Sequence, residues 1–119
     1  MDTTVVIDIL RGDEAARGFL MELEAPPACS EVTRIEILRG LRSRERSPAE
    51  RLLSQLDFVD VDEGIARRAG ELGRRWRRSH PGIGIADLAV AATAARLDGE
   101  PATANVKHFP MFPGLQPPY

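Results

Sequence analysis

The sequence has little of several features that define whole classes of protein. Only Cys29 among the 119 residues is a cysteine, so no internal disulfide can form and a reducing compartment is expected. No apolar run approaches the ~20 residues that a membrane-crossing helix needs. An acidic residue comes early and no cationic leader is visible. We therefore expect a cytoplasmic protein without a membrane segment.

An excess of positive charge is also missing. The chain has 16 Lys and Arg residues and 18 Asp and Glu residues, so its formal net charge is −2. This charge argues against a basic protein that coats nucleic acid. An enzyme that touches only a few phosphates does not need a high net charge. The length fits one domain over residues 1–119 with one buried core.

Short apolar runs alternate with helical patterns along the chain. Helices are expected after Asp13 to about residue 23, then at 31–42, 47–56, 62–79 and 86–97. Short strands are expected at 28–30, 58–61 and 101–104. This alternation predicts an α/β fold with a mainly parallel sheet, whose active site lies at the carboxyl ends of the strands.

Three acidic residues lie at junctions between predicted strands and helices, or at predicted helix starts. Asp2 begins a β-branched run, Glu36 lies between Ile35 and Ile37, and Asp87 opens an alanine-rich helix. A carboxylate near a core needs a partner, and a divalent cation is a common one. Oxygen-only ligands favour magnesium or manganese over zinc.

Other kinds of site find no support in the sequence. The two histidines, His80 and His108, are far apart, and one cysteine gives no zinc-ligand spacing. No glycine-rich phosphate loop is present, and no Ser-His-Asp arrangement can be argued. We expect His108 to have a structural role, with its ring hydrogen-bonded within the protein, rather than to act as a catalytic base.

Four segments in order resemble the PIN-domain ribonucleases, in particular VapC-type toxins of bacterial toxin–antitoxin pairs. The resemblance covers nearly the whole chain. The segments are DTTVVIDILRG at 2–12, IEILRG at 35–40, GIGIAD at 82–87 running on into AATA at 91–94, and TANVKHF at 103–109. Each alone is weak, but four in this order and spacing are specific.

The resemblance implies a three-layer α/β/α fold and a metal site. It implies that Asp2, Glu36 and Asp87 bind Mg²⁺ or Mn²⁺, and that Asn105 stands where many members have a fourth acid. Asparagine offers one neutral oxygen or holds a water at the metal, and its lower charge leaves one-metal or two-metal chemistry open. The resemblance also suggests that Thr3 and Thr103 support the site through their hydroxyls.

The start of the chain departs from the family pattern. In the family a short apolar strand in the middle of the sheet precedes the first aspartate, whereas here only Met1 precedes Asp2. Two explanations stay open: the true start lies upstream, so that the N-terminal strand is truncated, or Thr4 to Ile7 takes that strand's place. Asp8 is expected to face solvent or cap a helix rather than bind metal.

Each candidate residue also has a plainer interpretation. Asp87 could cap its helix, Glu36 could lie on an ordinary helix face, Asp2 could be a frayed terminus and Asn105 could be a turn residue. On the helix after Asp62, three arginines lie opposite an apolar stripe and form either a solvated face or an RNA-backbone contact. Those arginines are Arg67, Arg74 and Arg78, and the stripe is Ile65, Ala69, Leu72 and Trp76.

The sequence therefore predicts an endoribonuclease toxin that hydrolyses RNA phosphodiester bonds and is held inactive by a cognate antitoxin. The alternative is a catalytically weak PIN-fold module that binds RNA or the antitoxin. A DNA-directed nuclease is a third interpretation, disfavoured because the chain lacks elements to grip a duplex. A homodimer is expected, and the helix at 31–41 offers surface for dimer or antitoxin contacts as well as for the core.

Overall fold

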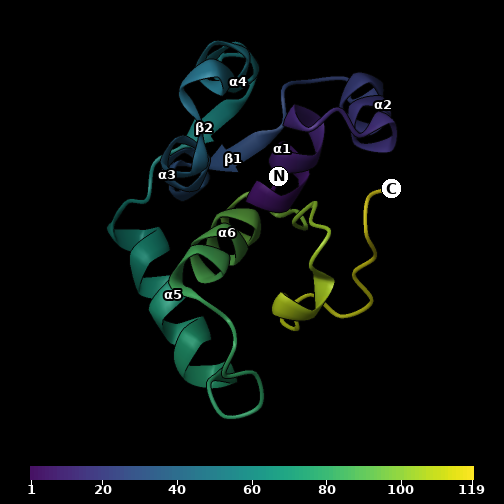
Figure 1. Cartoon of the computed structure of the whole chain (residues 1–119). Helices are drawn as coiled ribbons and strands as arrows, with labels where there is room; N and C mark the ends of the chain where they lie inside the picture. The colour runs from purple at the N-terminus through teal and green to yellow at the C-terminus, as the bar shows by residue number, and fades with distance from the viewer.

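The computed structural model describes all 119 residues and contains six α-helices around a small sheet (Figure 1). The sheet pairs β1 (Ala28–Ser30) with β2 (Asp57–Val59) in parallel, with Cys29 opposite Phe58. A parallel pair needs a crossover connection, and the chain supplies it with helices between the two strands. The predicted α/β class with a parallel sheet is confirmed, although the sheet has only two strands.

The six helices are α1 (Thr3–Leu10), α2 (Glu14–Glu22), α3 (Glu31–Gly40), α4 (Arg46–Leu53), α5 (Glu63–Trp76) and α6 (Ile85–Arg96), with 3₁₀ turns at Ser43–Glu45 and Val106–His108. Five of the six helices, α2 to α6, were predicted in this order, and the first was not. Asp13 caps α2 by accepting the Ala16 N–H, and Asp62 caps α5 by accepting the Ile65 N–H. No helix is long and apolar enough to cross a bilayer.

The N-terminal segment corrects one prediction. Thr4 to Ile7 does not take the place of a strand, because α1 already begins at Thr3. Val5, Val6 and Ile9 are buried on one face of this helix, and their burial outweighs the preference of β-branched residues for strands. Asp2 is itself buried, at 4% exposed, and is not a frayed terminus.

The backbone of Met1 and Asp2 joins two segments that are far apart in sequence. The Met1 ammonium donates to the Ala28 carbonyl at 2.7 Å, and the Asp2 N–H donates to the Ala102 carbonyl at 2.8 Å. The predicted strand at 101–104 is wrong, since no strand is formed there. The bond from the Asp2 N–H is the one backbone hydrogen bond that joins this segment to another part of the chain, and one bond does not make a strand ladder.

The start of α4 also differs from the prediction. A helix was expected at 47–56, but α4 begins at Arg46 directly after the 3₁₀ turn and ends at Leu53. The Glu45 side chain accepts the backbone N–H of Arg42 at 3.0 Å, so a side-chain cap lies one turn before α4.

Two apolar clusters hold the elements together. The larger lies between α1, α2, β1, α3 and α4, and the smaller joins α6 to the C-terminal segment through Val90, Ala91 and Phe109. Helices α5 and α6 pack closely: a Cβ at Gly73 would lie 2.9 Å from Leu88 Cδ1. The larger cluster consists of Val5, Val6, Ile9, Ala16, Cys29, Ile37, Ala49, Leu52, Leu53 and Leu56.

Polar contacts fasten the helix ends and the tail. The Arg96 guanidinium donates two hydrogen bonds of 2.9 Å to Asp62, which join the end of α6 to the start of α5 and lower the pKa of Asp62 to about 2. The Tyr119 hydroxyl donates to Asp8 at 2.6 Å. Asp8 therefore contacts the C-terminal residue and takes no part in the acidic constellation described below.

Candidate functional site

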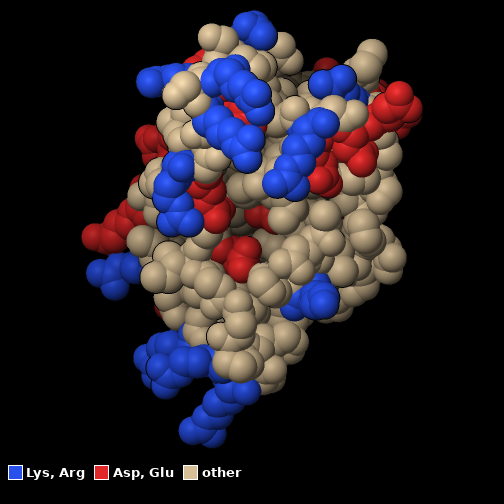
Figure 2. Space-filling model, in the orientation of Figure 1, with Lys and Arg blue, Asp and Glu red and all other residues tan.

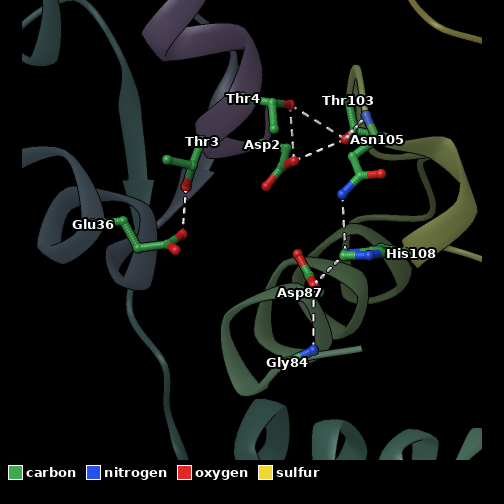
Figure 3. Close-up of polar contacts among 9 residues, drawn as sticks. All are labelled: Asp2, Thr3, Thr4, Glu36, Gly84, Asp87, Thr103, Asn105 and His108. Atoms are coloured by element: carbon green, nitrogen blue, oxygen red, sulfur yellow. Dashed lines mark hydrogen bonds and ion pairs between the residues drawn. The ribbon is translucent and has the colours of Figure 1, made fainter. Parts of the chain in front are cut away.

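The predicted acids come from three separate parts of the fold and gather at one place. Asp2 stands at the start of α1, Glu36 on the middle of α3, and Asp87 in the first turn of α6. Figure 3 shows the three carboxylates around one open space, and Figure 2 shows acidic side chains in a hollow near the middle of the same face. Lys and Arg side chains surround this hollow above and below.

Asp2 occupies the helix N-cap position without capping the helix. Its side chain makes no hydrogen bond to the first-turn N–H groups of α1. Oδ2 instead accepts from the Thr103 hydroxyl at 2.8 Å and from the Thr4 hydroxyl at 3.0 Å. Thr103 is fully buried and also accepts the Asn105 N–H, so the segment after α6 fixes the orientation of Asp2.

Glu36 is held by a buried pair of threonines. The Thr3 hydroxyl lies 2.6 Å from Glu36 Oε1 and 3.3 Å from the hydroxyl of Thr33, which is fully buried. Glu36 is half-buried while its neighbour Ile35 is exposed. Glu36 therefore lies on the inner part of α3, which is unusual for an ordinary helix-face glutamate.

Asp87 caps α6 and also faces the hollow. Its Oδ2 accepts the Gly84 N–H at 3.3 Å and lies 3.0 Å from His108 Nδ1. Asn105 Nδ2 lies 3.0 Å from the same ring nitrogen (Figure 3). The capping interpretation of Asp87 is therefore correct, but capping uses only one of its two oxygens.

The three carboxylates share one pattern of hydrogen bonding. Each has one oxygen engaged by the protein, namely Asp2 Oδ2, Glu36 Oε1 and Asp87 Oδ2. The second oxygen of each accepts no hydrogen bond from any side chain or backbone group, and none of these oxygens is sealed from solvent. Three such oxygens suit a hard divalent cation such as Mg²⁺ or Mn²⁺.

The arrangement is more open than that of an assembled metal centre. No group of three or more His, Cys, Asp or Glu side chains is close enough together to hold an ion. The carboxylate oxygens are suitable ligands for a divalent ion. The three carboxylates are nevertheless not close enough together to surround one ion.

Other candidates for chemistry are placed elsewhere. Cys29 is buried in the larger apolar cluster, and burial raises the pKa of its thiol, which keeps it from acting as a nucleophile. On the predicted stripe, Ile65 is buried and Ala69, Leu72 and Trp76 are half-buried, while Arg67 and Arg74 on α5 and Arg78 just after it are exposed. Arg67 pairs with Glu63 at 3.3 Å, and an RNA contact by this face stays a prediction.

Sequence reasoning missed several neighbours of the acids. Thr4 and Thr33 carried no signal beyond lying close in sequence to Asp2 and Glu36. His108 is satisfied, as predicted, but its partner turned out to be Asp87. A spacing of 21 residues across a helix and a turn gave no means of pairing these two side chains.

Comparison with known proteins identifies the family. A family model described as the PIN domain matches residues 1–109. The chain belongs to the PIN-domain family. The predicted resemblance and the three-layer α/β/α fold class are thereby confirmed.

Among PIN-domain relatives, two from Mycobacterium tuberculosis match over the whole of this chain. Ribonuclease VapC19 is 47% identical and is covered over 98% of its length. Ribonuclease VapC10 is 46% identical and is covered over 91% of its length. These relatives place the chain among the VapC-type PIN domains.

A solved structure extends the likeness to the arrangement in space. A chain of a toxin–antitoxin complex from Klebsiella pneumoniae superposes with a TM-score of 0.84 at 26% identity. The match covers 99% of this PIN domain and 95% of that chain. The superposition therefore includes every segment that carries a candidate site residue.

Proposed function

We propose that this PIN domain is a Mg²⁺- or Mn²⁺-dependent endoribonuclease and the toxin of a toxin–antitoxin pair in the cytoplasm. The observation that carries the proposal is the shared pattern of Asp2, Glu36 and Asp87, each with one oxygen held by the protein and one free. The names of the two mycobacterial ribonucleases support RNA as the substrate. The toxin–antitoxin complex supports an antitoxin as the partner.

The three acids would hold the cation through their free oxygens. When bound, the cation supplies Lewis-acid stabilisation of the phosphodiester and a nucleophile from water at neutral pH. Thr103 and Thr4 orient Asp2, and Thr3 orients Glu36, so each carboxylate is presented in a fixed direction. Such supporting partners tune metal affinity strongly. Asn105, predicted from the family pattern as the fourth residue of this group, contacts His108 rather than any of the three acids.

Surfaces around the acids suit the expected partners. Lys and Arg side chains above and below the hollow would attract the RNA backbone, although the net charge is −2 (Figure 2). Ile35 and Leu38 on α3 are 64% and 39% exposed and offer apolar surface for protein contacts. We expect α3 to contribute to a homodimer or to antitoxin binding.

Metal removal tests the proposed activity. We expect the protein to lose cleavage of single-stranded RNA after treatment with a chelator and to recover it with Mn²⁺ or Mg²⁺, measured by gel electrophoresis of labelled RNA. Glu36→Gln should stay inactive after metal is restored, because it loses the charge of one ligand. The exposed Glu71→Gln is the matched control and should recover fully.

Two outcomes would count against this function. Cleavage that is unchanged by the chelator would contradict metal dependence. RNA binding without cleavage at any concentration of Mn²⁺ or Mg²⁺ would favour a catalytically weak binding module instead.

A further inference from the structure

The segment after α6 brings Asn105 and His108 against Asp87. Asn105 precedes the 3₁₀ turn Val106–His108, and its N–H donates to the buried Thr103 hydroxyl at 3.0 Å. On the other side of the turn, Phe109 is 1% exposed and packs in the smaller apolar cluster. The turn is therefore anchored at both ends, so its polar side chains have little freedom.

Whether His108 Nδ1 carries a proton decides which hydrogen bonds it can donate or accept. This nitrogen lies 3.0 Å from Asp87 Oδ2 and 3.0 Å from the amide of Asn105. An ionised carboxylate can only accept, so Nδ1 must carry the proton and donate it to Asp87. A protonated Nδ1 has no lone pair left and cannot accept from the NH₂ group of Asn105.

The amide of Asn105 must then present its oxygen to the ring. The oxygen and nitrogen of an asparagine amide have nearly the same shape and are assigned from their partners. With its oxygen toward Nδ1–H, Asn105 shares the proton with Asp87, and both residues hold the ring in one orientation. One lone pair of the Asn105 oxygen is then engaged by His108, which directs this oxygen at the ring.

We propose that Asn105 and His108 form a positioning pair for Asp87, in which Asn105 acts through His108 rather than as a metal ligand. Asn105 fixes the ring, and the Nδ1–H group fixes Asp87 Oδ2 together with the Gly84 N–H. Asp87 Oδ1 is thereby directed toward the hollow. This inference rests on the proposed function, because it takes Asp87 to be a ligand of the cation.

Substitutions at His108 separate its Nδ1 donor from its bulk. The side-chain nitrogen of asparagine occupies nearly the place of Nδ1, whereas that of glutamine reaches the place of Nε2. We expect His108→Ala and His108→Gln to weaken Mn²⁺ binding about tenfold or more, the usual effect of losing such a partner. His108→Asn should bind Mn²⁺ nearly as the wild type does. The measurement is isothermal titration calorimetry with Mn²⁺ alone.

A double-mutant cycle tests whether Asn105 acts through His108. If it does, Asn105→Ala should weaken Mn²⁺ binding in the wild-type protein but cause no further loss in the His108→Ala background. Additive losses would instead identify Asn105 as an independent ligand and overturn the pairing. Thermal unfolding of each variant checks that the difference between His108→Asn and His108→Gln is not one of folding.

The variant Asp87→Asn distinguishes a failure of the proposed metal site from a failure of the proposed positioning pair. If Asp87→Asn binds Mn²⁺ as tightly as the wild type, the metal site itself is wrong. If Asp87→Asn loses Mn²⁺ binding while His108→Ala and His108→Gln retain it, the site stands and only the positioning pair is overturned.

Discussion

Asp87→Asn is expected to lower the rate of RNA cleavage by about two to three orders of magnitude at saturating Mn²⁺. A metal ion contributes several kcal/mol of transition-state stabilisation, and about 1.4 kcal/mol corresponds to a factor of ten in rate. The substitution keeps the shape of the side chain and an oxygen that can accept the Gly84 N–H. The loss should therefore reflect the missing charge rather than unfolding of α6.

Single-turnover cleavage of a labelled RNA measures this effect. Asp60→Asn is the matched control: it removes the same charge from an exposed residue between β2 and α5 and should cleave like the wild type. Equal rates for the wild type and Asp87→Asn, with both proteins folded, would remove Asp87 from the site.

Phe109→Ala is expected to have the largest effect on stability. Phe109 is 1% exposed and packs with Val90 and Ala91 of α6. Removing a buried aromatic ring costs about 3–5 kcal/mol, from lost burial and from the cavity left behind. Because Phe109 directly follows His108, the same change should loosen the turn that holds Asp87.

Denaturant unfolding, followed by circular dichroism, gives the free energy of unfolding for this comparison. Leu97→Ala is the control, since Leu97 is 50% exposed at the end of α6 and should cost far less. A loss below about 1 kcal/mol for Phe109→Ala, smaller than the range for buried aromatics, would contradict the packing of the C-terminal segment on α6.

Local signals in the sequence were sufficient for most of the fold. Asp13 and Asp62 each precede a helix whose first-turn N–H they accept, and the apolar stripe from Ile65 marks the less exposed side of α5. The short strand at 28–30 was recognisable because prolines precede it and a helix pattern follows it. Capping and periodicity are local properties, which a sequence records directly.

The N-terminal segment could not be predicted in the same way. Val5, Val6 and Ile9 are β-branched and by themselves favour a strand, and only their burial against other elements decides for the helix. The segment at 101–104 fails to form a strand for a related reason. Its one backbone neighbour is Asp2, and that pairing over 100 residues has no local signature.

The sequence proposes the acids of the candidate site but not the residues that support them. The order and spacing of the four segments indicated Asp2, Glu36 and Asp87, whose carboxylates face a common region in Figure 3 although they are not close enough together to hold an ion. Their partners are set by tertiary contacts: Thr103 reaches Asp2 across 101 residues, and His108 reaches Asp87 across a helix and a turn. Side-chain orientation at such distances depends on packing that the sequence does not display.

A crystal structure with Mn²⁺, read from its anomalous scattering, would show whether these three acids hold a metal ion. We expect an anomalous peak in the hollow, bounded by the carboxylates of Asp2, Glu36 and Asp87, and no peak there in a Glu36→Gln crystal prepared in the same way. A wild-type crystal without a peak between these carboxylates, at an Mn²⁺ concentration that supports RNA cleavage, would contradict this expectation.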